Sequence, residues 1–87
     1  MKAMDKPTAQ QIEHELVREV AMVLSREPSA IKPDEPLHAL GMDSMGFVEI
    51  LVFIERAYNL KLIESGLNRE DFETLRALAR RISQELR

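Results

Sequence analysis

Apolar residues recur every three or four positions in three stretches of the chain, which is the spacing of an amphipathic helix. The first stretch predicts a helix from about residue 9 to residue 25, with these apolar positions: Ile12, Leu16, Val20, Val23 and Leu24. Thr8 and Gln11 fit the capping box that satisfies free amide groups at a helix start. We expect Met1 to Pro7, before this cap, to form a frayed end.

A long connection follows the first predicted helix. Its prolines lack an amide proton and disfavour helix in the residue before them, so no continuous helix crosses it. These prolines are Pro28, Pro33 and Pro36. We expect Ile31 and Leu37 to hold this loop against the core, and the segment from Leu37 to Leu40 to form one helical turn before Gly41. Such a long, pinned loop in a small domain is typical of a functional segment.

Residues 44 to 58 give the strongest helix signal and are apolar around most of the helix circumference. One face carries Ile50, Leu51, Phe53, Ile54 and Tyr58. A helix in so small a domain cannot bury every apolar side chain, so we expect part of a second set to form an exposed contact surface. That set is Met45, Phe47, Val48 and Val52, and core packing is the alternative for each.

The remaining residues predict two further helices. Asn59 is a good stop for the preceding helix, and Asn68 to Phe72 predicts one short helix. Thr74 caps a final amphipathic helix with these apolar positions: Leu75, Leu78, Ala79, Ile82 and Leu86. We therefore expect an all-α fold, a small four-helix bundle with three main helices, one short helix and a long loop between the first two. Residues 1–87 are expected to form a single domain with an ordered core from about 9 to 86.

Charge and composition exclude several classes of function. The net charge is −3, and residues 34 to 73 hold nine acidic and three basic side chains, an acidic surface that favours basic partner patches over nucleic acid. The chain has no cysteine and two histidines, so we expect no bound metal and no protein thiol. No apolar run is long enough to span a membrane, and we expect a cytoplasmic monomer without membrane insertion.

Asp43 and Ser44 are the residues most suggestive of chemistry, because they stand between two glycines at the predicted start of an apolar helix. Either could simply cap that helix. Neither is followed by Glu or Gln three positions on, and one cap would suffice, so the other side chain is spare. The surrounding sequence does not match the G-x-S-x-G elbow of hydrolases, which also needs a preceding strand. His38, in the loop, is read as a solvated residue rather than a catalytic base.

The stretch from Leu40 to Met45, followed by Val48-Glu49-Ile50, resembles the acyl carrier protein family and its peptidyl and aminoacyl relatives. The order of helices and the long loop extend the resemblance over about 9 to 86. It implies that Ser44 carries 4′-phosphopantetheine, taken from coenzyme A, and that the thiol of this arm holds a substrate as a thioester. It also implies that Asp43 supports the transfer.

The resemblance further implies partners: a phosphopantetheinyl transferase, a ligase that loads an acyl or aminoacyl group, and a downstream transferase or synthase. The partner-binding residues would be Met45, Phe47, Val48, Glu49 and Val52. Gly46, Phe47 and Arg56 depart from the strongly acidic second helix of fatty-acid carriers. The resemblance is closer to D-alanyl and other discrete aminoacyl carriers, or to single carriers in specialised pathways. The protein would not be an enzyme. The alternative is an unmodified helical interaction module, and a DNA-binding helix-turn-helix ranks third because of the acidic central region.

Overall fold

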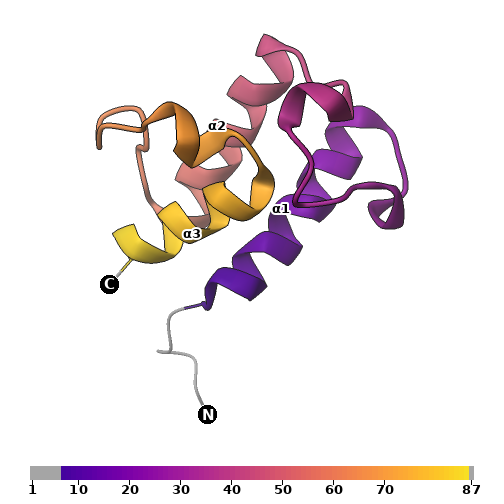
Figure 1. The fold of residues 1–87 in the computed structure, drawn as a ribbon. Helices are drawn as coiled ribbons and strands as arrows, with labels where there is room; N and C mark the ends of the chain where they lie inside the picture. Colours follow the sequence, from indigo (N-terminus) through magenta and orange to yellow (C-terminus); the bar gives the residue numbers. More distant parts are fainter. Residues whose placement is uncertain (1–6, 87) are drawn as a thin grey trace.

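The structure, a computed structural model, describes residues 7–86 and contains three α-helices in that range (Figure 1). These are α1 (Ala9–Leu24), α2 (Ser44–Tyr58) and α3 (Leu75–Glu85). Three short 3-10 helices lie in the connections: η1 (Pro28–Ala30), η2 (Leu37–Leu40) and η3 (Arg69–Phe72). The predicted all-α class is confirmed. The expected frayed segment lies outside the described residues except for Pro7.

Local sequence signals explain where the helices begin and end. Thr8 and Gln11 form the predicted capping box, in which the Gln11 backbone N–H donates to Thr8 Oγ1 at 3.1 Å and the Thr8 N–H donates to Gln11 Oε1 at 2.8 Å. Thr74 caps α3 by accepting from the backbone N–H of Ala77. Asn59 takes the left-handed conformation with φ 58° and ends α2. All three predicted boundary signals are confirmed.

The predicted short helix is a single 3-10 turn, so the bundle has three α-helices rather than four. Asn68 caps η3 and Asp71 closes its capping box as a first-turn acidic residue. The turn cannot lengthen because Thr74 already caps α3 two residues after Phe72. The segment between these two caps holds one turn and no more.

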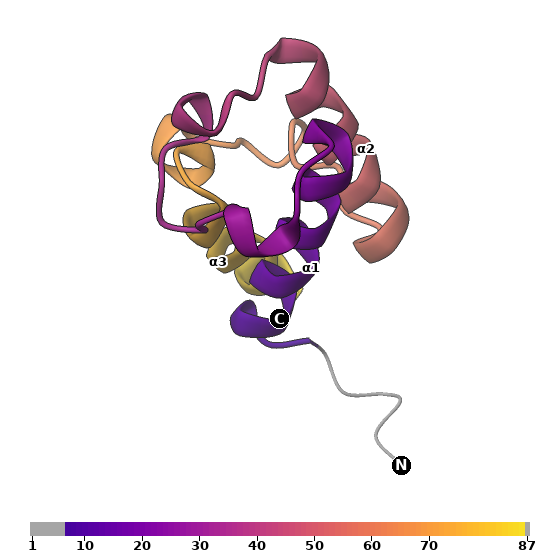
Figure 2. The ribbon, with the colours of Figure 1, turned by 90° about the vertical axis from the view of Figure 1, so that its right-hand side faces the viewer.

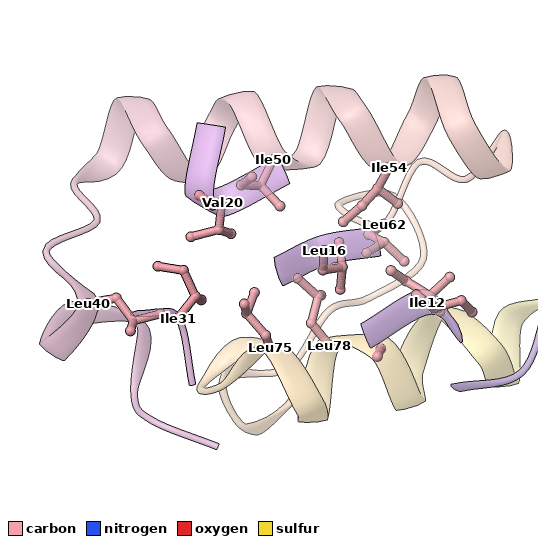
Figure 3. Close-up of a cluster of buried hydrophobic side chains, with 13 residues drawn as sticks. Ile12, Leu16, Val20, Ile31, Leu40, Ile50, Ile54, Leu62, Leu75 and Leu78 are labelled. Atoms are coloured by element: carbon pink, nitrogen blue, oxygen red, sulfur yellow. The ribbon is translucent and has the colours of Figure 1, made fainter. Parts of the chain in front are cut away.

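The core lies between the three α-helices, and α1 packs against both α2 and α3. Figure 3 shows Ile50 and Ile54 of α2 pointing toward Leu75 and Leu78 of α3, with Leu16 of α1 beside them, and all five are buried. The loop residues Ile31 and Leu40 are buried at one end of the same cluster, and Leu37 packs partly against it. The long connection is therefore pinned to the core by apolar side chains, as the sequence predicts.

Two backbone hydrogen bonds also join this connection to the start of α3. The Leu37 N–H donates to the Glu73 carbonyl oxygen at 3.0 Å, and the Arg76 N–H donates to the Pro33 carbonyl oxygen at 2.9 Å. Figure 2 shows η2 lying beside the segment that leads into α3. We call these two bonds the 33–37/73–76 clamp. It fixes the end of the loop that leads to Ser44.

Candidate functional site

Ser44 is the first residue of α2, and its side chain is exposed. The helix is capped by Asp43, whose Oδ1 accepts from the Gly46 backbone N–H at 2.8 Å. Within residues 7–86 the Ser44 hydroxyl has no recorded hydrogen-bond partner. The reading of Ser44 as a mere cap is thus wrong, because Asp43 supplies the cap. The spare side chain of the pair is a hydroxyl at the positive end of a helix dipole.

The segment before Ser44 is held on the protein by one buried side chain and one glycine turn. Leu40 is fully packed in the core, and Gly41 has φ 89°, a left-handed conformation that closes η2 without the steric cost of a Cβ. Met42 is half-buried against the core. The chain therefore turns sharply from the core to the exposed start of α2.

Gly46 allows a close approach that the sequence analysis did not foresee. It is buried, and a Cβ placed on it would lie 3.2 Å from Met42 Cγ, 3.3 Å from Asp43 Oδ1 and 3.5 Å from Val23 Cγ1. An alanine here would crowd Met42 and the capping carboxylate of Asp43 and would touch α1 at ordinary contact distance. The signal available in the sequence was a glycine inside a strong helix pattern, which usually has a packing reason.

A hollow of about 560 Å³ opens beside Ser44. Its lining comes from η2, from the start of α2 with the two residues before it, and from η3 with the residue after it. The lining residues are Leu37, His38, Met42, Asp43, Ser44, Phe47, Val48, Arg69, Phe72 and Glu73. We call this the Ser44 hollow. It joins Ser44 at the start of α2 to Arg69 in η3, 25 positions later in the chain, and no local sequence signal could reveal it.

The face of α2 that points to solvent is apolar and follows directly from Ser44. Met45 is 68% exposed, Val48 51% and Val52 43%, and Glu49 is also exposed. We call these four residues the exposed α2 face. The sequence left core packing and surface exposure as alternatives for four apolar residues. Core packing is excluded for three of them: Met45, Val48 and Val52.

Phe47, the fourth of those apolar residues, has a different environment. It is half-buried, and its ring centroid lies 5.3 Å from that of Phe72 at a tilt of 41°. This is an aromatic pair within the range of favourable contact. Phe47 thus joins α2 to η3 and lines the Ser44 hollow instead of lying on the exposed α2 face.

Ile63 extends the apolar surface beyond α2 and was missed by the sequence analysis. It is 73% exposed in the loop after α2, and a second hollow of about 410 Å³ lies between this loop and α2. Val48 and Val52 line this second hollow together with Ile63. Leu62, the residue before it, is buried.

Other predicted elements have structural roles in the described part of the chain. Asp71 forms an ion pair with Arg81 and closes the capping box of η3. Residues 7–86 contain no group of three or more His, Asp or Glu side chains placed to hold a metal ion. No helix in this range is both long enough and apolar enough to cross a bilayer.

The fold and the site define a small helical protein that presents an exposed serine hydroxyl at a capped helix start, beside a hollow and an apolar face. A comparison with protein families matches residues 14–82 to the family described as Phosphopantetheine attachment site. This match covers most of the chain, and the protein belongs to that family. The comparisons with curated proteins and with solved structures returned no match.

Membership establishes the general role. The protein is a non-catalytic carrier whose cofactor is covalently attached 4′-phosphopantetheine, and the resemblance to carrier proteins is confirmed. Such a carrier interacts with a phosphopantetheinyl transferase and with synthase or ligase enzymes. The residues at the start of α2 fit the group, because an accessible hydroxyl at a helix N-terminus can accept a phosphoryl group and the helix dipole favours its negative charge.

Proposed function

We propose that Ser44 is the residue that bears the 4′-phosphopantetheine arm and that residues 1–87 act as a single discrete carrier domain. The observation that supports this most strongly is that Asp43, and not Ser44, caps the start of α2. Asp43 caps α2, which leaves the adjacent hydroxyl exposed and without a structural partner among the described residues. A residue with no packing or capping duty can be modified at no cost to the fold.

The proposed modification is a phosphoryl transfer. Ser44 Oγ attacks the phosphorus atom that carries the pantetheine portion of coenzyme A, and one Oγ–P bond forms. The pyrophosphate P–O bond breaks, adenosine 3′,5′-bisphosphate leaves, and the serine proton passes to the transferase or to water. The Asp43 carboxylate, one residue away and exposed, is proposed to help the transferase hold its metal ion and coenzyme A. The arm then supplies the thiol that a chain without cysteine lacks.

The exposed α2 face is the proposed surface on which partner enzymes dock. Met45, Val48 and Val52 offer apolar contacts next to the arm, and Glu49 offers a charge for a basic patch. Phe47 is proposed to contact partners only by its accessible edge, since it is partly covered by the protein and packs against Phe72. Enzymes that dock here would find the attachment residue at the first turn of the same helix.

We further propose that the load is a small aminoacyl or acyl group, attached by a separate ligase. Apolar side chains form one buried cluster between the α-helices, and both the Ser44 hollow and the second hollow beside α2 are open to solvent. A long acyl chain left in water would lose roughly 0.8 kcal/mol of burial for each methylene group, which a small polar load avoids. Gly46 and Phe47 also replace charged positions typical of carriers with strongly acidic second helices.

Incubation with coenzyme A and a broad-specificity phosphopantetheinyl transferase, followed by intact mass measurement, tests the attachment residue. We expect the wild-type chain to gain the mass of one phosphopantetheine group and Ser44→Ala to gain nothing. Ser29→Ala is the matched control, because Ser29 is also an exposed serine in a short helical segment, and it should be modified like the wild type. An equal mass gain in Ser44→Ala would refute the assignment.

The load can be tested separately on the modified protein. Acyl-coenzyme A donors of increasing chain length attach preloaded arms, and amide and methyl NMR spectra report on the core. We expect the signals of Leu16, Ile54 and Leu78 to stay unchanged at every chain length. Shifts at these buried residues with long chains alone would show that the bundle opens to shelter a long acyl group, and the proposal of a small load would be wrong.

A further inference from the structure

The Ser44 hollow contains an arginine side chain whose role the carrier function does not by itself explain. Arg69 is the one basic side chain among the charged residues that line it, and Asp43 and Glu73 are the acidic ones, with His38 also on the wall. No ion pair joins Arg69 to either carboxylate, although the described part of the chain contains three other ion pairs. The guanidinium of Arg69, exposed in the same hollow as Ser44, is therefore available for an anion.

The rest of the Ser44 hollow is apolar. Leu37 comes from η2 and Val48 from α2, while the Phe47–Phe72 pair joins α2 to η3. Leu37, Phe47 and Phe72 are partly buried, and Val48 is exposed. A hollow that combines one cation with an apolar strip suits an occupant with an anionic end and an apolar middle.

We propose that the phosphopantetheine arm folds back into the Ser44 hollow, with its phosphodiester facing Arg69 and its dimethyl segment against Phe47 and Phe72. This rests on the proposed attachment at Ser44. An arginine can pair with a phosphate through two parallel N–H bonds, and the α2 N-terminus adds a favourable dipole on the other side. Arg69 is thus a positioning residue for the resting arm.

The hold is weak, and this matches what a carrier requires. Arg69 is exposed and the hollow is open, so solvent and salt screen the pair. Asp43 and Glu73 add some repulsion toward the phosphodiester, although Asp43 is engaged in capping. The arm therefore exchanges between the hollow and solvent and stays free to enter partner enzymes.

The experiment compares three modified proteins: the wild type, Arg69→Gln, and Arg80→Gln as a control. Arg80 is an exposed arginine on α3 outside the Ser44 hollow. Each is modified with coenzyme A and a transferase and checked by intact mass. Isotope-filtered NMR then measures nuclear Overhauser effects between the arm's methyl protons and the Phe72 ring, and ³¹P NMR follows the phosphodiester as salt is raised.

We expect arm-to-Phe72 effects and a salt-dependent ³¹P shift in the wild type and in Arg80→Gln, and a clear loss of both in Arg69→Gln. Absence of the effects in modified wild type, or their full retention in Arg69→Gln, would overturn the proposal while leaving the attachment at Ser44 intact. Failure of Arg69→Gln alone to be modified would assign Arg69 to the transferase and also overturn it. Failure of the wild type to be modified on Ser44 would instead refute the proposed function.

Discussion

Replacing Asp43 separates its two proposed duties, which are capping α2 and supporting the transfer to Ser44. In the structure Asp43 Oδ1 accepts one hydrogen bond from the Gly46 N–H at 2.8 Å. Asp43→Ala removes this acceptor and leaves a buried glycine N–H beside Met42, where solvent reaches it poorly. Asp43→Asn keeps an oxygen that can accept the same bond but removes the charge.

The expected magnitudes differ enough to be measured. Loss of an N-cap acceptor costs about 1 kcal/mol of unfolding free energy, so Asp43→Ala should lower the melting temperature by roughly 4–8 °C in a chain of this size. Asparagine caps about as well as aspartate, and Asp43→Asn should lose only about 0.3 kcal/mol through the missing charge at the helix dipole. Both variants should accept the phosphopantetheine arm much more slowly than the wild type if the carboxylate serves the transferase.

Thermal unfolding followed by circular dichroism gives the stabilities, and a time course of intact mass gives the transfer rates. Asp43→Asn is the matched control for capping. Equal destabilisation of both variants would refute the claim that an oxygen acceptor at this position holds the helix start. A wild-type transfer rate in Asp43→Asn would refute a role for the carboxylate in the transfer while leaving the capping argument in place.

Four further substitutions test the packing and electrostatics of α2 and of the turn before it. Burial, and then a hydrogen bond to Glu15, raise the pKa of Tyr58 above its ordinary value of about 10. The contribution of Tyr58 to the free energy of unfolding should therefore be constant below pH 10 and fall above it as the unfolded tyrosine ionises. Tyr58→Phe should abolish this added fall in denaturant titrations at rising pH. Ile54→Ala should cost about 2–5 kcal/mol in urea unfolding, because Ile54 is fully buried. Val52 lies two residues away and is exposed, so Val52→Ala should change stability by less than about 0.5 kcal/mol. Similar losses for both variants would contradict the observed rotation of α2. Gly41→Ala should cost about 1–2 kcal/mol of thermal stability, since its φ is 89°, and a neutral effect would contradict the left-handed turn.

The helix boundaries were predictable because their causes are local. Thr8 with Gln11, Asn59 and Thr74 each act within one turn of their own position, and the sequence displays such signals completely. The core positions of α1 and α3 were also predictable, since polar residues occupy the opposite faces of both helices. In α1 and α3 the amphipathic pattern allows only one rotation of each helix relative to the core.

The rotation of α2 could not be predicted because the helix is apolar on nearly every side. Only packing against α1 and α3 decides that Ile50 points inward and Val48 outward. The contact of Phe47 with Phe72 and the Ser44 hollow could not be predicted either, because each forms between segments that are far apart in the sequence. The sequence thus indicated which residue is special but not which surfaces surround it.

The 33–37/73–76 clamp has a consequence for engineering the chain. Loop residues 25–30 should tolerate a change in number without moving Ser44, because the buried Ile31 and the clamp fix the backbone position after them. Between Leu37 and Ser44 the chain is tied at both ends, and an added residue would displace the first turn of α2. A fusion or a reporter peptide therefore belongs near Ser29, at the exposed η1 turn, and a library of loop lengths there should retain a modifiable carrier.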